Sequence, residues 1–159
     1  MKKTIIAALI QFLMVVEISS VSKAQEAIMF DHFDNIYCDD EKARLDNFAI
    51  QLQNQPDAIG YIVFYGGRRY GPAGHTRLPR RKEGEARAAR LKSYLLIGSR
   101  NLDPKRIVLV NGGYRETWQA ELWVVPQSTK PPILKPTLKP EQIKFRKGVA
   151  REKDYHCEV

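Results

Sequence analysis

The residues best suited to binding chemistry form a basic cluster in the middle of the chain. Its members are Arg68, Arg69, Tyr70, His75, Arg77, Arg80, Arg81 and Lys82. Six of these side chains are basic, so the cluster can contact an anionic polymer or an acidic protein partner. The alternative is a solvated surface loop whose charge only keeps the protein soluble. Segment 68–82 contains four prolines and glycines and has no periodicity, which predicts a loop.

The sequence gives little support for catalysis or for a metal site. The histidines, His32, His75 and His156, have no spacing typical of metal ligands. Neither a G-x-S-x-G nucleophile motif nor a phosphate-binding glycine motif occurs in the chain. We therefore expect a protein that is not an enzyme and has no cofactor or metal.

The first residues have the plan of a secretory signal peptide. Lys2 and Lys3 precede an apolar run over residues 4–16, and small residues at 22–24 offer a cleavage site. The apolar run has 13 residues, whereas a membrane-spanning helix needs about 20. We expect a cleaved signal peptide over residues 1–24 and a periplasmic or secreted protein. An uncleaved signal peptide that anchors the chain in the membrane is the less favoured alternative.

Charge and cysteine content fit an exported protein. The chain has a net charge of +8, and removal of residues 1–24 leaves +6. This charge favours anionic partners, and export makes nucleic acid the least expected of them. In an oxidising compartment Cys38 and Cys157 are candidates for a disulfide, which could contribute about 4–5 kcal/mol to stability. Two unpaired thiols are the alternative.

The hydrophobic pattern predicts two helices and four strands in the order β-α-β-α-β-β. The strands are expected at 27–33, 59–65, 107–110 and 121–125, and the second helix at 84–95. The first helix is expected to start with Asp39 or Asp40 as its N-cap, to end before Pro56 and to bury Leu45, Phe48, Ala49 and Leu52. This order predicts an α/β (α+β) sandwich, a mixed sheet with both helices on one face. The first two strands should be parallel, and the last two should form an antiparallel hairpin.

In the second helix, Arg87, Arg90 and Tyr94 share a stripe separate from the apolar one. Its Arg87-Ala88 pair, its Tyr94-Leu95 end and the following LDPKRI segment (residues 102–107) form an ordered series. Together with the opening AIMFDHF (residues 27–33), the series resembles the OmpA-like domain over residues 27–126. OmpA-like domains attach bacterial envelope proteins to peptidoglycan.

The resemblance implies where a ligand would bind. OmpA-like domains hold the diaminopimelate of peptidoglycan with an aspartate in a GHTD-type loop and the arginine of the helical RA pair. Arg87 matches that arginine. At the aspartate position this chain has an arginine, either Arg68 directly after the strand or Arg77 in the GHTR sequence (residues 74–77). An ammonium group would meet repulsion there, so the resemblance does not by itself predict the usual ligand.

These observations predict a signal peptide (1–24), an OmpA-like domain (25–126) and an extended tail rich in proline and lysine (127–159). We expect an exported bacterial envelope protein that binds peptidoglycan or another anionic envelope polymer without a covalent bond. Binding would use Arg87 and the basic cluster. The alternative is a structural interaction subunit of an envelope or membrane protein complex that does not bind the wall. The sequence makes no prediction of oligomeric state.

Overall fold

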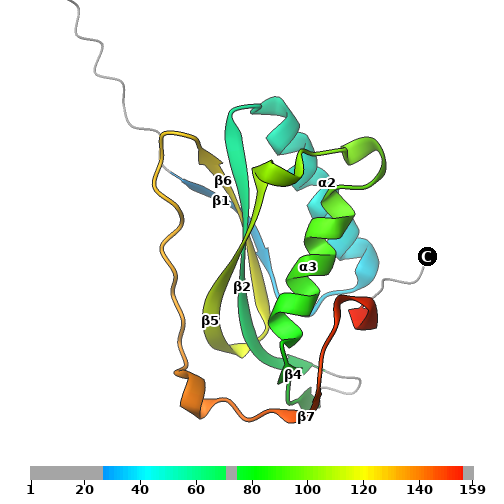
Figure 1. Cartoon of the computed structure of the whole chain (residues 1–159), viewed down its shortest axis with the longest axis vertical. Helices are drawn as coiled ribbons and strands as arrows, with labels where there is room; N and C mark the ends of the chain where they lie inside the picture. The colour runs from blue at the N-terminus through cyan, green and yellow to red at the C-terminus, as the bar shows by residue number, and fades with distance from the viewer. Residues whose placement is uncertain (1–26, 71–74, 156–159) are drawn as a thin grey trace, which may run out of the picture.

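The computed structural model describes residues 27–70 and 75–155. Two helices pack against a mostly antiparallel five-stranded sheet, which confirms the predicted α+β fold (Figure 1). The predicted signal peptide, residues 1–24, lies outside the described residues. Among the described residues, no helix is long and apolar enough to cross a membrane.

The sheet contains β1 (Ile28–Phe33), β2 (Ala58–Tyr70), β3 (Thr76–Arg77), β5 (Ile107–Thr117) and β6 (Gln119–Pro126). Strand β6 lies between β1 and β2 and is antiparallel to both, so β1 and β2 run in the same direction as predicted. Strand β5 pairs with β2 in parallel, and β3 extends the far end of β2. The long strand β2 therefore connects all the other strands except β1.

The predicted hairpin between the last two strands is wrong, because β2 lies between β5 and β6. The chain crosses the end of β2 at Trp118, whose backbone N–H donates to the carbonyl of Arg68. Gly67 makes this crossing possible, since a Cβ atom there would lie 2.2 Å from the carbonyl carbon of Thr117. The crossing places β6 inside the sheet, where Ala120, Leu122, Val124 and Val125 are buried.

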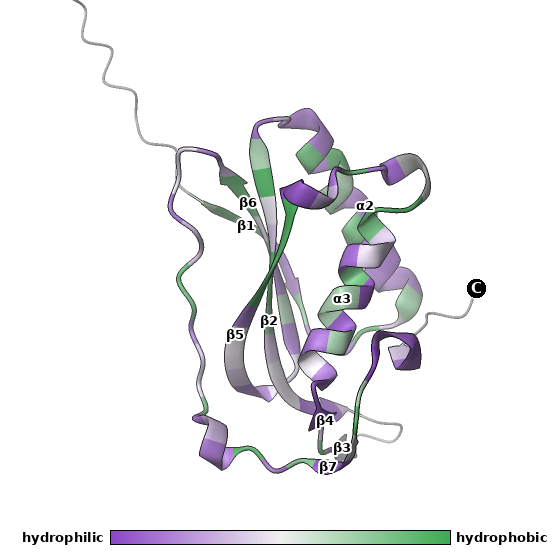
Figure 2. Cartoon of the chain, viewed as in Figure 1, coloured by the Kyte–Doolittle hydropathy of each residue, from purple (hydrophilic) through white to green (hydrophobic). Residues whose placement is uncertain are grey.

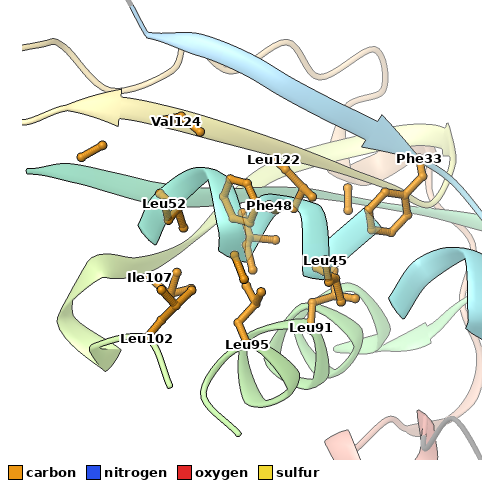
Figure 3. Packing of buried hydrophobic residues seen from close by; sticks show 14 of the residues in the cluster. Phe33, Leu45, Phe48, Leu52, Leu91, Leu95, Leu102, Ile107, Leu122 and Val124 are labelled. Atoms are coloured by element: carbon orange, nitrogen blue, oxygen red, sulfur yellow. The ribbon is translucent and has the colours of Figure 1, made fainter. Parts of the chain in front are cut away.

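Helices α2 (Cys38–Asn54) and α3 (Glu83–Leu95) bury the stripes that the sequence predicts. Leu45, Phe48, Leu91 and Leu95 are fully buried and meet side chains of the sheet in one hydrophobic core (Figure 3). The predicted N-cap of α2 is wrong. Tyr37 is the N-cap residue, and the two aspartates that follow lie in the first turn, where negative charge favours the helix dipole.

Arg106 closes the other end of α2. Its guanidinium donates hydrogen bonds to the backbone carbonyls of Leu52, Gln55 and Ala58. These carbonyls lie where the helix ends and β2 begins, so one side chain joins three segments of the chain.

The prediction of a loop over residues 68–82 is wrong in part. Strand β2 continues to Tyr70, and the short strands β3 and β4 (Arg80–Arg81) follow. Residues 71–74 lie outside the described part of the chain.

The C-terminal segment returns to the body of the protein. Residues 130–137 contain no helix or strand, as predicted, and Leu138 then bridges to Tyr114 of β5. After the 3-10 turn η4 (Pro140–Gln142), strand β7 (Arg146–Val149) pairs in parallel with β4. The last turn, η5 (Glu152–Tyr155), lies beside α3, where Figure 1 shows it in red and Figure 2 shows it as strongly hydrophilic.

Candidate functional site

A pocket of about 170 Å³ lies between the start of α2, the end of β2, the side of α3 and the C-terminal turn η5. It is lined by Cys38, Glu41, Arg69, Arg87, Arg90, Asp154 and Tyr155. We call this site the arginine pocket. Three guanidinium groups and two carboxylates converge there from four parts of the chain that are distant in sequence.

Arg87 is the most unusual residue of the arginine pocket. Only 4% of its surface is exposed, yet no carboxylate among the described residues forms an ion pair with it. Its guanidinium lies 3.7 Å from the centre of the Trp118 ring and donates a 3.3 Å hydrogen bond to Asn35 Oδ1. Burial and then the nearby Arg69 lower the pKa of Arg87 to about 9, which leaves the group protonated at neutral pH. The fold therefore holds a desolvated positive charge without a counter-charge bonded to it.

Arg69 lies next to Arg87 and shares its acceptor. Its Nε donates a 3.0 Å hydrogen bond to the same Asn35 Oδ1, so one amide oxygen draws two guanidinium groups together. Burial lowers the pKa of Arg69, and Glu83, with Oε1 3.7 Å from Nη1, partly offsets this. The Arg69 charge is thus only loosely compensated.

The third guanidinium of the arginine pocket is neutralised. Arg90 forms an ion pair with Glu41, which is only 3% exposed. The other carboxylate lining the arginine pocket, Asp154, is 3.0 Å from Arg80 Nη2. Both acids pair with arginines, so the excess charge of the arginine pocket is positive. It comes mainly from Arg87, and Arg69 adds a charge that Glu83 compensates only loosely.

The structure divides the site residues predicted from the sequence into three groups. Arg69 and Arg87 line the arginine pocket. Arg80 holds the C-terminal turn through Asp154 and through a 3.1 Å hydrogen bond to the Tyr155 hydroxyl. The remaining predicted residues, Arg68, Arg77 and Arg81, are exposed and lie outside the arginine pocket.

Sequence reasoning did not assign site roles to Asn35, Glu41, Arg90, Asp154 and Tyr155. Arg90 was recognisable as a neighbour of Arg87 on one helical stripe. The others had no distinguishing signal, because an asparagine in a loop and acids near helix starts are ordinary surface residues.

The predicted disulfide bears on the same region. Cys38 lines the arginine pocket together with Tyr155, the last described residue, and it is not a free thiol. Cys157 lies outside the described residues, so its pairing with Cys38 stays a prediction.

The chemistry of the arginine pocket is that of anion binding. Within residues 27–70 and 75–155, no group of three or more His, Cys, Asp or Glu side chains could hold a metal ion. Buried guanidinium groups form strong charge-assisted hydrogen bonds with carboxylates and other oxyanions.

Comparison of the chain with family models, curated proteins and solved structures finds no match. The resemblance to OmpA-like domains therefore stays a prediction.

Proposed function

We propose that the protein is an exported envelope protein, periplasmic or secreted, that binds an anionic group of a cell-wall polymer in the arginine pocket. The observation that carries the proposal is Arg87, a buried guanidinium that lines a pocket and has no carboxylate partner among the described residues. The resemblance to OmpA-like domains suggests peptidoglycan as the polymer.

The charges of the arginine pocket favour a carboxylate over an ammonium group as the bound part of the ligand. Its two acids are paired with arginines, Arg69 has only the more distant Glu83, 3.7 Å away, and Arg87 has no carboxylate partner among the described residues. The peptides of peptidoglycan carry free carboxylates, which match an arginine fork. The exposed Arg68, Arg77 and Arg81 would add long-range attraction that salt weakens.

Co-sedimentation with purified peptidoglycan sacculi tests this proposal. The variant Arg87→Met removes the uncompensated charge, and Arg44→Met is the matched control, because Arg44 pairs with Asp31 outside the arginine pocket. We expect the parent and the Arg44 variant to sediment with sacculi and the Arg87 variant to lose at least tenfold in affinity. Equal binding by all three proteins would contradict the role of the arginine pocket.

A structural interaction subunit is the second candidate function. Exposed apolar side chains on β1 and on the C-terminal segment favour it, namely Ile28, Met29, Ile133 and Leu134. Under this alternative, a protein partner would co-purify with the chain whether or not Arg87 is replaced, and sacculi would not bind.

A further inference from the structure

A second cavity, with a volume of about 430 Å³, lies between the end of β2, the connection from β3 to β4, strand β5 and the C-terminal segment. Its apolar walls are Leu78, Pro79, Leu138 and Ile143. We call it the second cavity. It shares no lining residue with the arginine pocket, so the proposed function leaves it without a role.

The C-terminal segment forms one wall of the second cavity and is attached to the body of the protein on both sides of it. The carbonyl of Tyr114 on β5 accepts a hydrogen bond from the N–H of Leu138, and the carbonyl of Pro79 accepts one from the N–H of Arg146, each at 3.0 Å. Figure 1 shows the segment between these attachments in orange, running from η4 to β7. The folded chain therefore holds this wall at both ends.

Two basic side chains at the second cavity have no counter-ion. Arg68 and Lys144 line the cavity, and neither forms an ion pair among the described residues. Glu116 also lines it, but its carboxylate accepts a 2.8 Å hydrogen bond from the Thr137 hydroxyl. Two cations and one acid leave an excess of positive charge beside apolar walls. This combination suits a ligand with an apolar body and an anionic head.

We propose that the second cavity binds a single linear fatty acid, with the acyl chain between the apolar walls and the carboxylate at Arg68 and Lys144. Small-molecule pockets measure about 300–1,000 Å³ and combine apolar walls with a few polar groups that orient the ligand. The second cavity has this size and composition, which fit one short chain better than the two chains of a phospholipid. The proposal uses no residue of the arginine pocket, so it holds whether or not that pocket binds the cell wall.

Isothermal titration calorimetry of the full chain with decanoate, below the concentration at which micelles form, tests this proposal. Decyltrimethylammonium has the same chain with a positive head, and acetate has the same head without the chain. We expect one decanoate to bind per chain and the two other ligands to bind at least tenfold more weakly. NMR signals of Leu78 and Ile143 should shift most when decanoate is added. No binding of decanoate, equal binding of decyltrimethylammonium or shifts confined to the arginine pocket would overturn the proposal.

Paired substitutions separate the second cavity from general charge attraction. Arg68→Gln/Lys144→Gln should weaken decanoate binding at least tenfold. Lys130→Gln/Lys147→Gln is the matched control, because it removes the same charge from exposed lysines that do not line the second cavity. An equal loss in both double variants would overturn the proposal.

Two further measurements complete the test. Arg87→Met should bind decanoate as the parent does, so a failure of the arginine pocket and a failure of the second cavity can be told apart. Vesicles of anionic phospholipid are the last ligand. Binding to these vesicles without binding to decanoate would make the basic residues a membrane contact and would overturn the fatty-acid site.

Discussion

Replacing Arg87 with methionine removes a buried positive charge and keeps a side chain of similar length over Trp118. Burial and the adjacent Arg69 lower the pKa of Arg87 from its ordinary value to about 9. At about 1.4 kcal/mol for each pKa unit, the folded protein holds this charge at a cost of about 5 kcal/mol.

The substitution also removes favourable contacts. The stacking of the guanidinium on the indole contributes about 1–2 kcal/mol, and the hydrogen bond to Asn35 about 1–2 kcal/mol. The difference predicts that the Arg87→Met variant is about 1–3 kcal/mol more stable than the parent protein, although it no longer binds an anion. Such a gain in stability with a loss of binding is typical of a residue kept for function.

Urea unfolding at pH 7, followed by far-ultraviolet circular dichroism, measures this difference. Arg106→Met is the matched control, because Arg106 satisfies three backbone carbonyls at the end of α2. That variant should be less stable than the parent by about 2–4 kcal/mol. If Arg87→Met also lowers the free energy of unfolding by 1 kcal/mol or more, Arg87 serves the fold. The buried charge would then give no reason to expect a ligand.

Three further predictions concern the fold and its C-terminal turn. Gly67→Ala should lower the free energy of unfolding by about 3 kcal/mol or more, because the added Cβ would overlap the backbone of β5. A thermal unfolding midpoint equal to the parent's would contradict the close approach of the two backbones at this crossing. Glu41→Gln should lower the free energy of unfolding in urea by about 3 kcal/mol, because the buried Glu41 side chain loses its ion pair with Arg90, and an unchanged midpoint would show that this ion pair does not stabilise the fold. The backbone N–H of Arg151 donates a hydrogen bond to the Asp154 carboxylate and holds the pKa of Asp154 below its ordinary value. The ionised carboxylate therefore stabilises the turn above about pH 4. This stabilisation is lost as the pH falls through the pKa that Asp154 has in the folded protein. The Tyr155 ring signals in NMR spectra should therefore shift towards those of the Asp154→Asn variant as the pH falls from 5 to 2, and signals unchanged to pH 2 would contradict this.

The helices and the strand segments were predictable because their patterns are local. The spacing of Leu45, Phe48 and Leu52 places these residues on one face whatever the partner is, and the structure buries all three. The order of the strands in the sheet was harder to predict from the sequence. A strand with apolar residues on both faces fits the middle of a sheet, but its neighbours depend on contacts distant in sequence. We predicted a hairpin because the last two strands are consecutive in the chain. The chain instead crosses the end of β2 at Trp118, so β2 lies between these strands.

Residues of the arginine pocket were predictable only where a local sequence pattern already marked them. Arg87 matched a family pattern, and Arg69 belonged to an evident basic cluster. Their common acceptor, Asn35, lies 52 residues before Arg87, and Tyr155 lies 75 residues after Arg80. No local pattern relates residues at such separations, because the folded sheet and the returning tail bring them together.

Acidic side chains around the arginine pocket explain how the fold tolerates several arginines in one place. Like charges that are desolvated together repel, and the structure limits this repulsion with acids from three elements, α2, α3 and η5. Glu41 comes from α2 and is buried, so it neutralises Arg90 as long as the protein is folded. Glu83 at the start of α3 is also buried and lies within 4 Å of Arg69 and Arg77, and Asp154 pairs with Arg80 beside the arginine pocket. Among the described residues, none of these acids forms an ion pair with Arg87, so the repulsion that remains acts on the guanidinium that the proposed function assigns to the ligand.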